Sequence, residues 1–242
     1  IDRAEKLVET AQIDGKTVEV LTLSLQLQHW VELTLQVCET ADRRVIQGES
    51  VPNCEKLFSL FETHTQLYRR GKAGSPNQFG RLLLVFEDGA GFISHYHLMD
   101  RDAQDADVIV EQTRSAQRKH RGGIEVASFD RGFYSPENEW ELSQIVDHVC
   151  SPPRHPAQYA ERLSSASVEF HRTRQRHSGV ESTIGVLQRG NGLKRCRDCS
   201  ELGFERYLGL AVLGRNIHTL GKLIIARHDA MSAAAQSKRK AA

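Results

Sequence analysis

The sequence predicts an α/β fold in which helices flank a mixed sheet. Three observations support this expectation. Strand-like runs alternate with segments of helical period between residues 51 and 229, and a long helical segment precedes them. The chain of 242 residues is also long enough to bury one complete α/β core with some additional helix.

The N-terminal residues 1–50 are expected to be helical. Residues 17–47 place apolar side chains three and four positions apart, which is the spacing of one face of a long amphipathic helix. Gly48 and Pro52 are expected to end it, and a shorter helix over 2–11 is expected before it.

Four strands and one helix are predicted next. The strand-like runs are Lys56–Phe61, Arg81–Phe86, Phe92–Leu98 and residues 124–129. A Gly/Ser/Pro loop at 71–76 and a hairpin turn at Glu87-Asp88-Gly89 separate the first three, and residues 105–118 have helical spacing.

The remaining segments complete a predicted layered fold. Ser135 and Pro136 suit the N-cap and first position of a helix, Val146–Cys150 suits a strand, and residues 157–176 and 178–189 suit two helices that meet near Gly179. A last helix is expected over 201–228. The order suits a ribonuclease H-like fold over 51–229, followed by a basic disordered tail at 230–242.

Charge is informative through its distribution. The net charge is only +1, yet residues 162–197 contain eight Lys or Arg and two acids, Glu169 and Glu181. Such a local field suits phosphates, and a solvated helix face is the alternative interpretation. The sequence also predicts a cytoplasmic protein. Its five cysteines form no regular framework, no apolar run approaches the roughly 20 residues of a membrane span, and no signal peptide is found.

Two carboxylates stand out as metal-ligand candidates. Asp130 follows the strand-like run 124–129, and Glu181 lies in an Arg- and His-rich helix. Acids from a strand end and a distant helix can hold the divalent ions that two-metal phosphoryl transfer requires. The competing interpretations are a turn or N-cap role for Asp130, and an ion pair with Arg176 or Arg189 for Glu181.

A third acid is expected on the first strand, where Glu62 is available. Glu87 and Asp88 at the end of the second strand, and Asp105 at the start of a helix, are further candidates for the first acid. The turn and N-cap functions of these three residues compete with a role in a metal site.

Several pieces occur in an order that resembles a known family. They are Leu57–His64 followed by Arg69-Arg70-Gly71-Lys72 and Phe79-Gly80, then Phe129–Ser135, Gly179-Val180-Glu181-Ser182, Gly190–Cys196 and Leu213–Ile217. Together they resemble the catalytic domain of a DDE transposase from a bacterial insertion sequence, in the broad group around the fourth and fifth insertion-sequence families. The similarity covers about two-thirds of the chain.

The resemblance implies a ribonuclease H-like fold, Mg²⁺ or Mn²⁺, and cleavage and joining of double-stranded DNA ends. It places the acids at Glu62, Asp130 and Glu181, and it implies a homodimer in a complex with both DNA ends, in the bacterial cytoplasm at the nucleoid. The chain opens on Ile1, so an upstream DNA-binding domain is expected. The candidate DNA contacts are Arg69, Arg70, Lys72, Arg172, Arg176, His177, Arg189, Lys194 and Arg195.

Two residues depart from the family pattern. Glu62 stands where the family usually has Asp, and Gln188 stands where a basic residue is expected two turns after the third acid. A longer first acid shifts a ligand by about one methylene, which matters at a geometrically exact site. A nuclease of the same fold and a catalytically inactive DNA-binding remnant are therefore the alternative functions.

Overall fold

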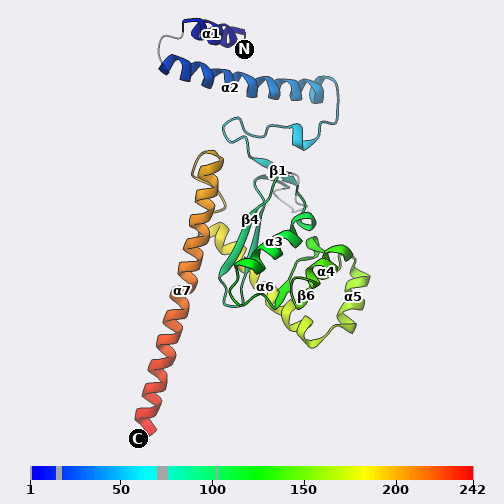
Figure 1. The fold of residues 1–242 in the computed structure, drawn as a ribbon, viewed down its shortest axis with the longest axis vertical. Coiled ribbons are helices and arrows are strands. Elements are labelled where there is room, and N and C mark those ends of the chain that lie inside the picture. The colour runs from blue at the N-terminus through cyan, green and yellow to red at the C-terminus, as the bar shows by residue number, and fades with distance from the viewer. Residues whose placement is uncertain (1, 15–17, 70–75, 102, 242) are drawn as a thin grey trace. The chain divides into compact units, whose positions relative to one another are not determined.

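The computed structural model describes residues 2–14, 18–69, 76–101 and 103–241 of an α/β protein (Figure 1). The chain divides into two compact units, Ile1–Arg81 and Leu82–Ala242, called here the N-terminal and the C-terminal unit. The division falls after Arg81, whereas the sequence pattern placed a boundary after residue 50. Each unit is described by itself.

The N-terminal unit combines two helices with a short hairpin. Helix α1 (Asp2–Asp14) packs on α2 (Val18–Ala41), which continues as a π-helical turn over Asp42–Ile46. The expected helix over 17–47 is therefore confirmed within a residue at each end. A 3₁₀ turn (Asn53–Glu55) follows, and β1 (Gln66–Arg69) pairs antiparallel with β2 (Asn77–Gly80).

The strand predicted at Lys56–Phe61 is wrong. Those residues are irregular, and they lead into a turn in which the backbone N–H of Glu62 donates to Ser59 Oγ at 3.0 Å. The N–H of Thr65 donates to the Glu62 carbonyl at 2.9 Å. The first strand instead begins at Gln66, where the partner β2 is near in sequence and the loop to be closed is short.

The C-terminal unit opens with the hairpin of β3 (Leu83–Glu87) and β4 (Ile93–Leu98), which is close to the prediction. The carboxylate of Asp88 closes the turn by accepting hydrogen bonds from the N–H groups of Ala90 and Phe92, both at 2.9 Å. The expected turn function of Asp88 is thereby confirmed.

A parallel strand pair follows the helix α3 (Asp105–Lys119). Strand β5 (Val126–Ser128) pairs with β6 (His148–Cys150), and α4 (Pro136–Ser143) makes the crossover between them. Ser135 caps α4 by accepting a hydrogen bond from the N–H of Asn138 at 3.0 Å, and Pro136 occupies its first turn, as predicted.

Three helices complete the unit: α5 (Pro156–Ser165), α6 (Val168–Arg189) and α7 (Ser200–Ala241). The predicted break near Gly179 is wrong, because α6 runs through it. The break lies at Ala166-Ser167 instead, where Ser167 caps α6 by accepting from the N–H of Phe170 at 3.2 Å. The segment expected to be a disordered tail is helical to Ala241, in agreement with its alanines and its basic end.

Two clusters of buried side chains form the core of the C-terminal unit. The first brings together β3, α3, the end of β5 and α4, through Leu84, Met99, Ile109, Phe129 and Leu142. The second joins β4, α6 and α7, through Ile93, Leu187, Leu208 and Val212. The described strands pair as three two-stranded sheets, β1-β2, β3-β4 and β5-β6, in place of the one mixed sheet expected.

Helix α7 is fixed to the β3–β4 hairpin by the side chains of Thr219 and Asn216, and Thr219 Oγ1 donates to the Gly91 carbonyl at 3.4 Å. The Asn216 amide accepts from the N–H of Ile93 at 2.8 Å and donates to the Ile93 carbonyl at 2.9 Å. Arg215 of the same turn donates to Thr183 Oγ1 of α6 at 3.1 Å. The first half of α7 is therefore held, whereas its second half extends away from the rest of this unit (Figure 1).

Candidate functional site

Asp130 lies two residues beyond β5, at the start of a 3₁₀ turn over Arg131–Phe133. Its carboxylate makes no side-chain cap to that turn, so an N-cap role does not apply. The side chain is 62% exposed, and Oδ1 lies 3.6 Å from Arg174 Nη2 and 3.6 Å from His177 Nε2. Asp130 therefore faces helix α6.

Helix α6 reaches the end of β5 with two side chains one turn apart. Arg174 donates from Nη1 to the Phe129 carbonyl at 3.3 Å, in addition to its contact with Asp130. Burial lowers the pKa of His177, and the charge of Arg174 lowers it further, while Asp130 and a backbone bond to Ser128 act in the opposite direction. His177 is therefore a neutral neighbour of Asp130 near pH 7, and Arg174 is the charged one.

Glu181 is one turn beyond His177 on the same helix, and residues four apart share a helix face. Its side chain is exposed. Neither Arg176 nor Arg189 pairs with it within the described part of the chain; Arg189 lies over Gly185 instead. The contact between His177 and Asp130 thus joins the strand end that carries Asp130 to the helix turn that leads to Glu181.

The loop that follows Asp130 is held from several sides. A Cβ placed on Gly132 would lie 3.0 Å from Asp105 Oδ2, so the carboxylate of Asp105 rests against this loop. Arg154 donates to the Arg131 carbonyl at 3.2 Å, and the Arg131 guanidinium lies 4.3 Å from the ring centre of Tyr159. Asp105, one of the candidates for the first acid, is therefore close to the Asp130 loop.

Glu62 belongs to the N-terminal unit, whereas Asp130 and Glu181 belong to the C-terminal unit. It is half-buried, and its Oε2 lies 3.6 Å from His64 Nδ1. Two further candidates for the first acid lie at the β3–β4 hairpin. Asp88 is occupied by the hairpin turn, and Glu87 has one carboxylate oxygen, Oε2, buried without a hydrogen-bond partner.

The predicted DNA-contacting residues lie in both units. Arg69 is exposed at the end of β1, while Arg70 and Lys72 lie outside the described residues. Among the predicted DNA contacts of the C-terminal unit, His177 is half-buried. The others are exposed: Arg172, Arg176, Arg189, Lys194 and Arg195.

Lys194 and Arg195 follow a turn that requires glycine. Gly192 has φ +82°, and an added Cβ would lie 2.6 Å from the Tyr207 hydroxyl. The Tyr207 hydroxyl also donates to the Gly192 carbonyl at 3.3 Å, which fixes this loop to α7. The two basic side chains are therefore presented from an anchored loop.

Arg174 is the residue that sequence reasoning missed. It belongs to the basic field of residues 162–197, in which the sequence pattern indicates no particular contact for it. Its position three residues before His177, on the same side of a helix, was the available signal. Asp130 and Arg174 lie far apart in the sequence, on different elements, which explains why local patterns did not reveal the ion pair.

The carboxylates suit Mg²⁺ in kind, because Asp130 and Glu181 are exposed oxygen donors and Mg²⁺ keeps several of its waters. Within the described ranges, no group of three or more His, Cys, Asp or Glu side chains is gathered closely enough to hold a metal ion. Asp130 and Glu181 both lie in the C-terminal unit, and the described contacts join Asp130 to Arg174 and His177.

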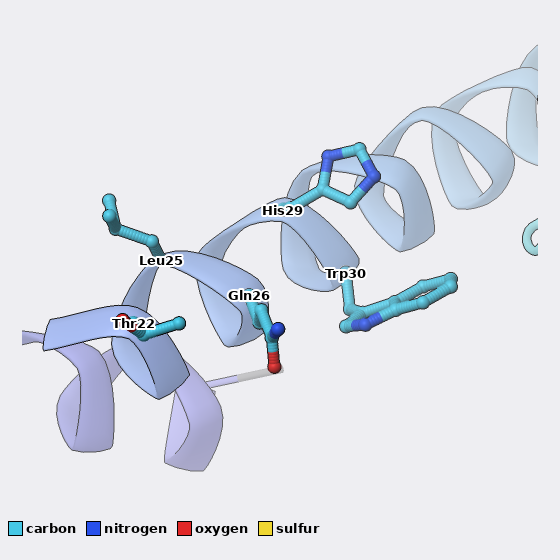
Figure 2. Close-up of a pocket in the computed structure, with 5 residues that line it drawn as sticks. All are labelled: Thr22, Leu25, Gln26, His29 and Trp30. Carbon is cyan, nitrogen blue, oxygen red and sulfur yellow. The ribbon is translucent and has the colours of Figure 1, made fainter. Parts of the chain in front are cut away.

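Two hollows on the surface contain none of the three acids. One has a volume of about 560 Å³, and its lining residues, Thr22, Leu25, Gln26, His29 and Trp30, all come from α2. Figure 2 shows these five side chains along the helix. This hollow has no acidic, Lys or Arg side chain, and it is an open side of the helix. A second, of about 290 Å³, lies beside β5, β6 and the start of α6, and includes Arg162 and Cys150.

No helix among the described residues is long and apolar enough to cross a membrane. Comparison with known proteins found no matching family model, no matching curated protein and no matching solved structure.

Proposed function

We propose that this chain is a DNA transposase that cleaves and joins DNA strands, with Glu62, Asp130 and Glu181 as its carboxylates and Mg²⁺ or Mn²⁺ as its ion. The observation that carries the proposal is the contact of Asp130, beyond β5, with the turn of α6 that leads to Glu181. The similarity of the sequence motifs to those of insertion-sequence transposases supports it as well.

The proposal includes a ribonuclease H-like arrangement of the C-terminal unit. Its support is the order of an antiparallel hairpin, a helix, a strand, a crossover helix, a parallel strand and further helices over residues 83–189. In this arrangement the end of β5 presents Asp130, and α6 crosses the β5–β6 pair.

Each residue near Asp130 has a distinct role in the proposed site. Arg174 holds the strand end through the Phe129 carbonyl and limits the orientations of the Asp130 carboxylate. The neutral His177 ring lies beside Asp130 Oδ1 without adding a second positive charge. When bound, the divalent ion activates the attacking hydroxyl and stabilises the leaving oxygen.

Double-stranded DNA is the proposed partner, and the phosphate backbone is its recognised part. Arg172 and Arg176 are exposed one turn apart on α6, and Arg189, Lys194 and Arg195 are exposed at and after its end. Such contacts supply affinity without reading sequence, and they weaken steeply with salt. The proposal places the chain in the bacterial cytoplasm, where it acts on both ends of an element as a homodimer.

The test is metal-dependent cleavage and joining of duplexes that copy the DNA flanking the coding sequence. We expect cleavage and a joined product with Mg²⁺, and a loss on the order of 10²-fold or more in Asp130→Asn and Glu181→Gln, because each removes charge stabilisation of the transition state. Asp147→Asn and Glu169→Gln are matched controls, since both acids are exposed and lie just before β6 and on α6. Equal cleavage by wild type and Asp130→Asn excludes the proposal, and cleavage without joining identifies a nuclease.

A catalytically inactive DNA-binding remnant is the second candidate. The observation in its favour is that Asp130 already has a cationic partner, Arg174, with which a metal ion must compete. This candidate predicts salt-sensitive binding to duplex DNA, with no Mg²⁺-dependent product from the wild type and no change in binding on Asp130→Asn.

A further inference from the structure

Helix α7 carries apolar side chains on two opposite faces. One face is buried in the C-terminal unit through Leu208, Ala211 and Val212. Nine residues are two and a half helical turns, so Ile217 lies opposite Leu208, and Leu220 lies opposite Ala211. Ile217 is 60% exposed and Leu220 is 49% exposed, so the second face is open.

The open face follows a seven-residue repeat. Its side chains are 49–64% exposed and are spaced three and four residues apart: Leu210, Leu213, Ile217, Leu220, Ile224 and Met231. In heptad terms, the a positions are Leu210, Ile217, Ile224 and Met231, and the d positions are Leu213, Leu220 and Arg227. We call this surface the α7 seam.

The composition of the α7 seam selects a partner. Its two central a positions are β-branched Ile and two of its three d positions are Leu, a combination that favours parallel two-stranded coiled coils, in which each layer meets its own copy. Such a seam is complementary to itself, as a two-fold interface requires. Gly221 occupies a flanking e position, and a Cβ on it would have open space around it, so a second helix can approach closely there, whereas Gly214, one heptad earlier, lies against the Asn191 side chain.

We propose that the α7 seam binds a second copy of this chain in a parallel, in-register coiled coil. The body of the C-terminal unit covers the opposite face of α7 and reaches the edges of the seam at Gly209, Gly214 and Asn216, while the a and d side chains between these edges stay exposed. Because the body packs on the first half of α7, a parallel pair places both bodies at the same end of the coil. The inference does not depend on the proposed chemistry.

The size of the seam sets the expected strength. From Leu210 to Met231 it runs about 32 Å on a helix about 10–12 Å wide, which corresponds to on the order of 1,000 Å² buried over two copies. That area lies at the low end of specific interfaces, where reversible associations occur. Arg227 weakens the last layer, although its aliphatic stem can cover apolar surface while its charge stays in water. We therefore expect a dimer that dissociates on dilution.

The first experiment measures the mass of the full chain by light scattering over a range of concentrations. The wild type is expected to move from 27.2 kDa toward twice that mass, and Ile217→Asp is expected to remain monomeric. Ile225→Asp is the control, since Ile225 is 62% exposed on α7 but lies outside the seam. Circular dichroism of both variants confirms that the chain stays folded.

The second experiment tests the parallel register. Ile217→Glu and Ile217→Lys should each be monomeric alone and should form a mixed dimer when combined, because each a residue faces its own copy. The same result is expected for Ile224→Glu with Ile224→Lys. An antiparallel pair can restore only one of the two combinations, which would overturn the register.

Two outcomes overturn the proposal as a whole. One is a wild type that stays monomeric at every concentration; a fall in thermal stability on Ile217→Asp would then assign the seam to another segment of the same chain. The other is equal dimerisation of Ile217→Asp and Ile225→Asp.

Discussion

The surroundings of Asp130 and of Glu62 differ in how many elements hold them. Asp130 follows a strand with a parallel partner, and a helix reaches it through Arg174 and His177. Glu62 lies in a turn whose contacts include Ser59 and His64, only three and two residues away. The difference teaches that an apolar run before an acid forms a strand only where another strand pairs with it.

The largest expected effect tests whether the two acids act together despite this difference. We expect Glu62→Gln to lower Mg²⁺-dependent DNA cleavage as strongly as Asp130→Asn, on the order of 10²-fold, if both hold ions at one centre. Initial rates on a labelled duplex measure it. Wild-type rates for Glu62→Gln, combined with a loss in Asp105→Asn, would transfer the role of first acid to Asp105.

The next largest expected effect is a difference in stability between two truncated side chains, one in the C-terminal core and one beside Glu62. Leu142 is fully buried in the first core cluster, so Leu142→Ala should lower the free energy of unfolding by about 2–5 kcal/mol. Phe61, beside Glu62, is 80% exposed, and Phe61→Ala should cost less than about 1 kcal/mol. Urea titration measures both, with Trp30 reporting on the N-terminal unit and Trp140 on the C-terminal unit. A larger loss for Phe61→Ala would show that the segment before Glu62 is packed more firmly than its exposure indicates.

Two serines give a finer comparison. Ser167 caps α6, which carries Arg174 and His177, so Ser167→Ala should lower the free energy of unfolding by about 1 kcal/mol. Ser59 accepts a single bond from the Glu62 N–H outside any helix, and Ser59→Ala should cost less than about 0.5 kcal/mol. Thermal unfolding followed by circular dichroism measures both, and equal losses would contradict the stated difference.

The smallest effect is a pH dependence centred on His177. Its pKa in the folded chain is lowered, so the unfolded chain binds more protons below about pH 6.5. The stability that the neutral ring contributes is complete above that pH and is lost as the pH falls toward the folded pKa. His95, whose pKa burial also lowers, adds to the same trend.

The measurement is the melting temperature between pH 5 and 8. We expect His177→Gln to flatten its decline on acidification. The exposed His171 of the same helix provides the control, His171→Gln. An unchanged pH profile in His177→Gln would remove His177 as a source of the effect.

Local patterns predicted much of the secondary structure of the C-terminal unit. Alternation and turn residues located β3 and β4, and Ser135-Pro136 located the start of α4, because these signals act over a few residues. The same reasoning failed at Lys56–Phe61, which has apolar residues but no paired strand, and at Gly179, which lies inside α6 with open space around it.

The position of Asp130 after a strand was predictable from the sequence, and the partners of its carboxylate were not. Asp130 and Glu181 stood out from their positions after a strand-like run and on a basic helix. The partnership of Asp130 with Arg174 depends on how α6 crosses β5, and that crossing is set by tertiary packing of residues such as Thr173 and Leu187, both buried. The spacing of residues along the chain therefore does not predict this crossing.

The side chain of Asn216 has a consequence for solubility. Strand β4 has no strand partner on its outer side among the described residues, and an unpaired strand edge can recruit a strand from another chain and begin aggregation. At Ile93, however, both backbone groups of that edge are already bonded to the Asn216 amide, so an incoming strand finds neither donor nor acceptor there. Asn216 thus blocks the pairing of a further strand with β4 at Ile93.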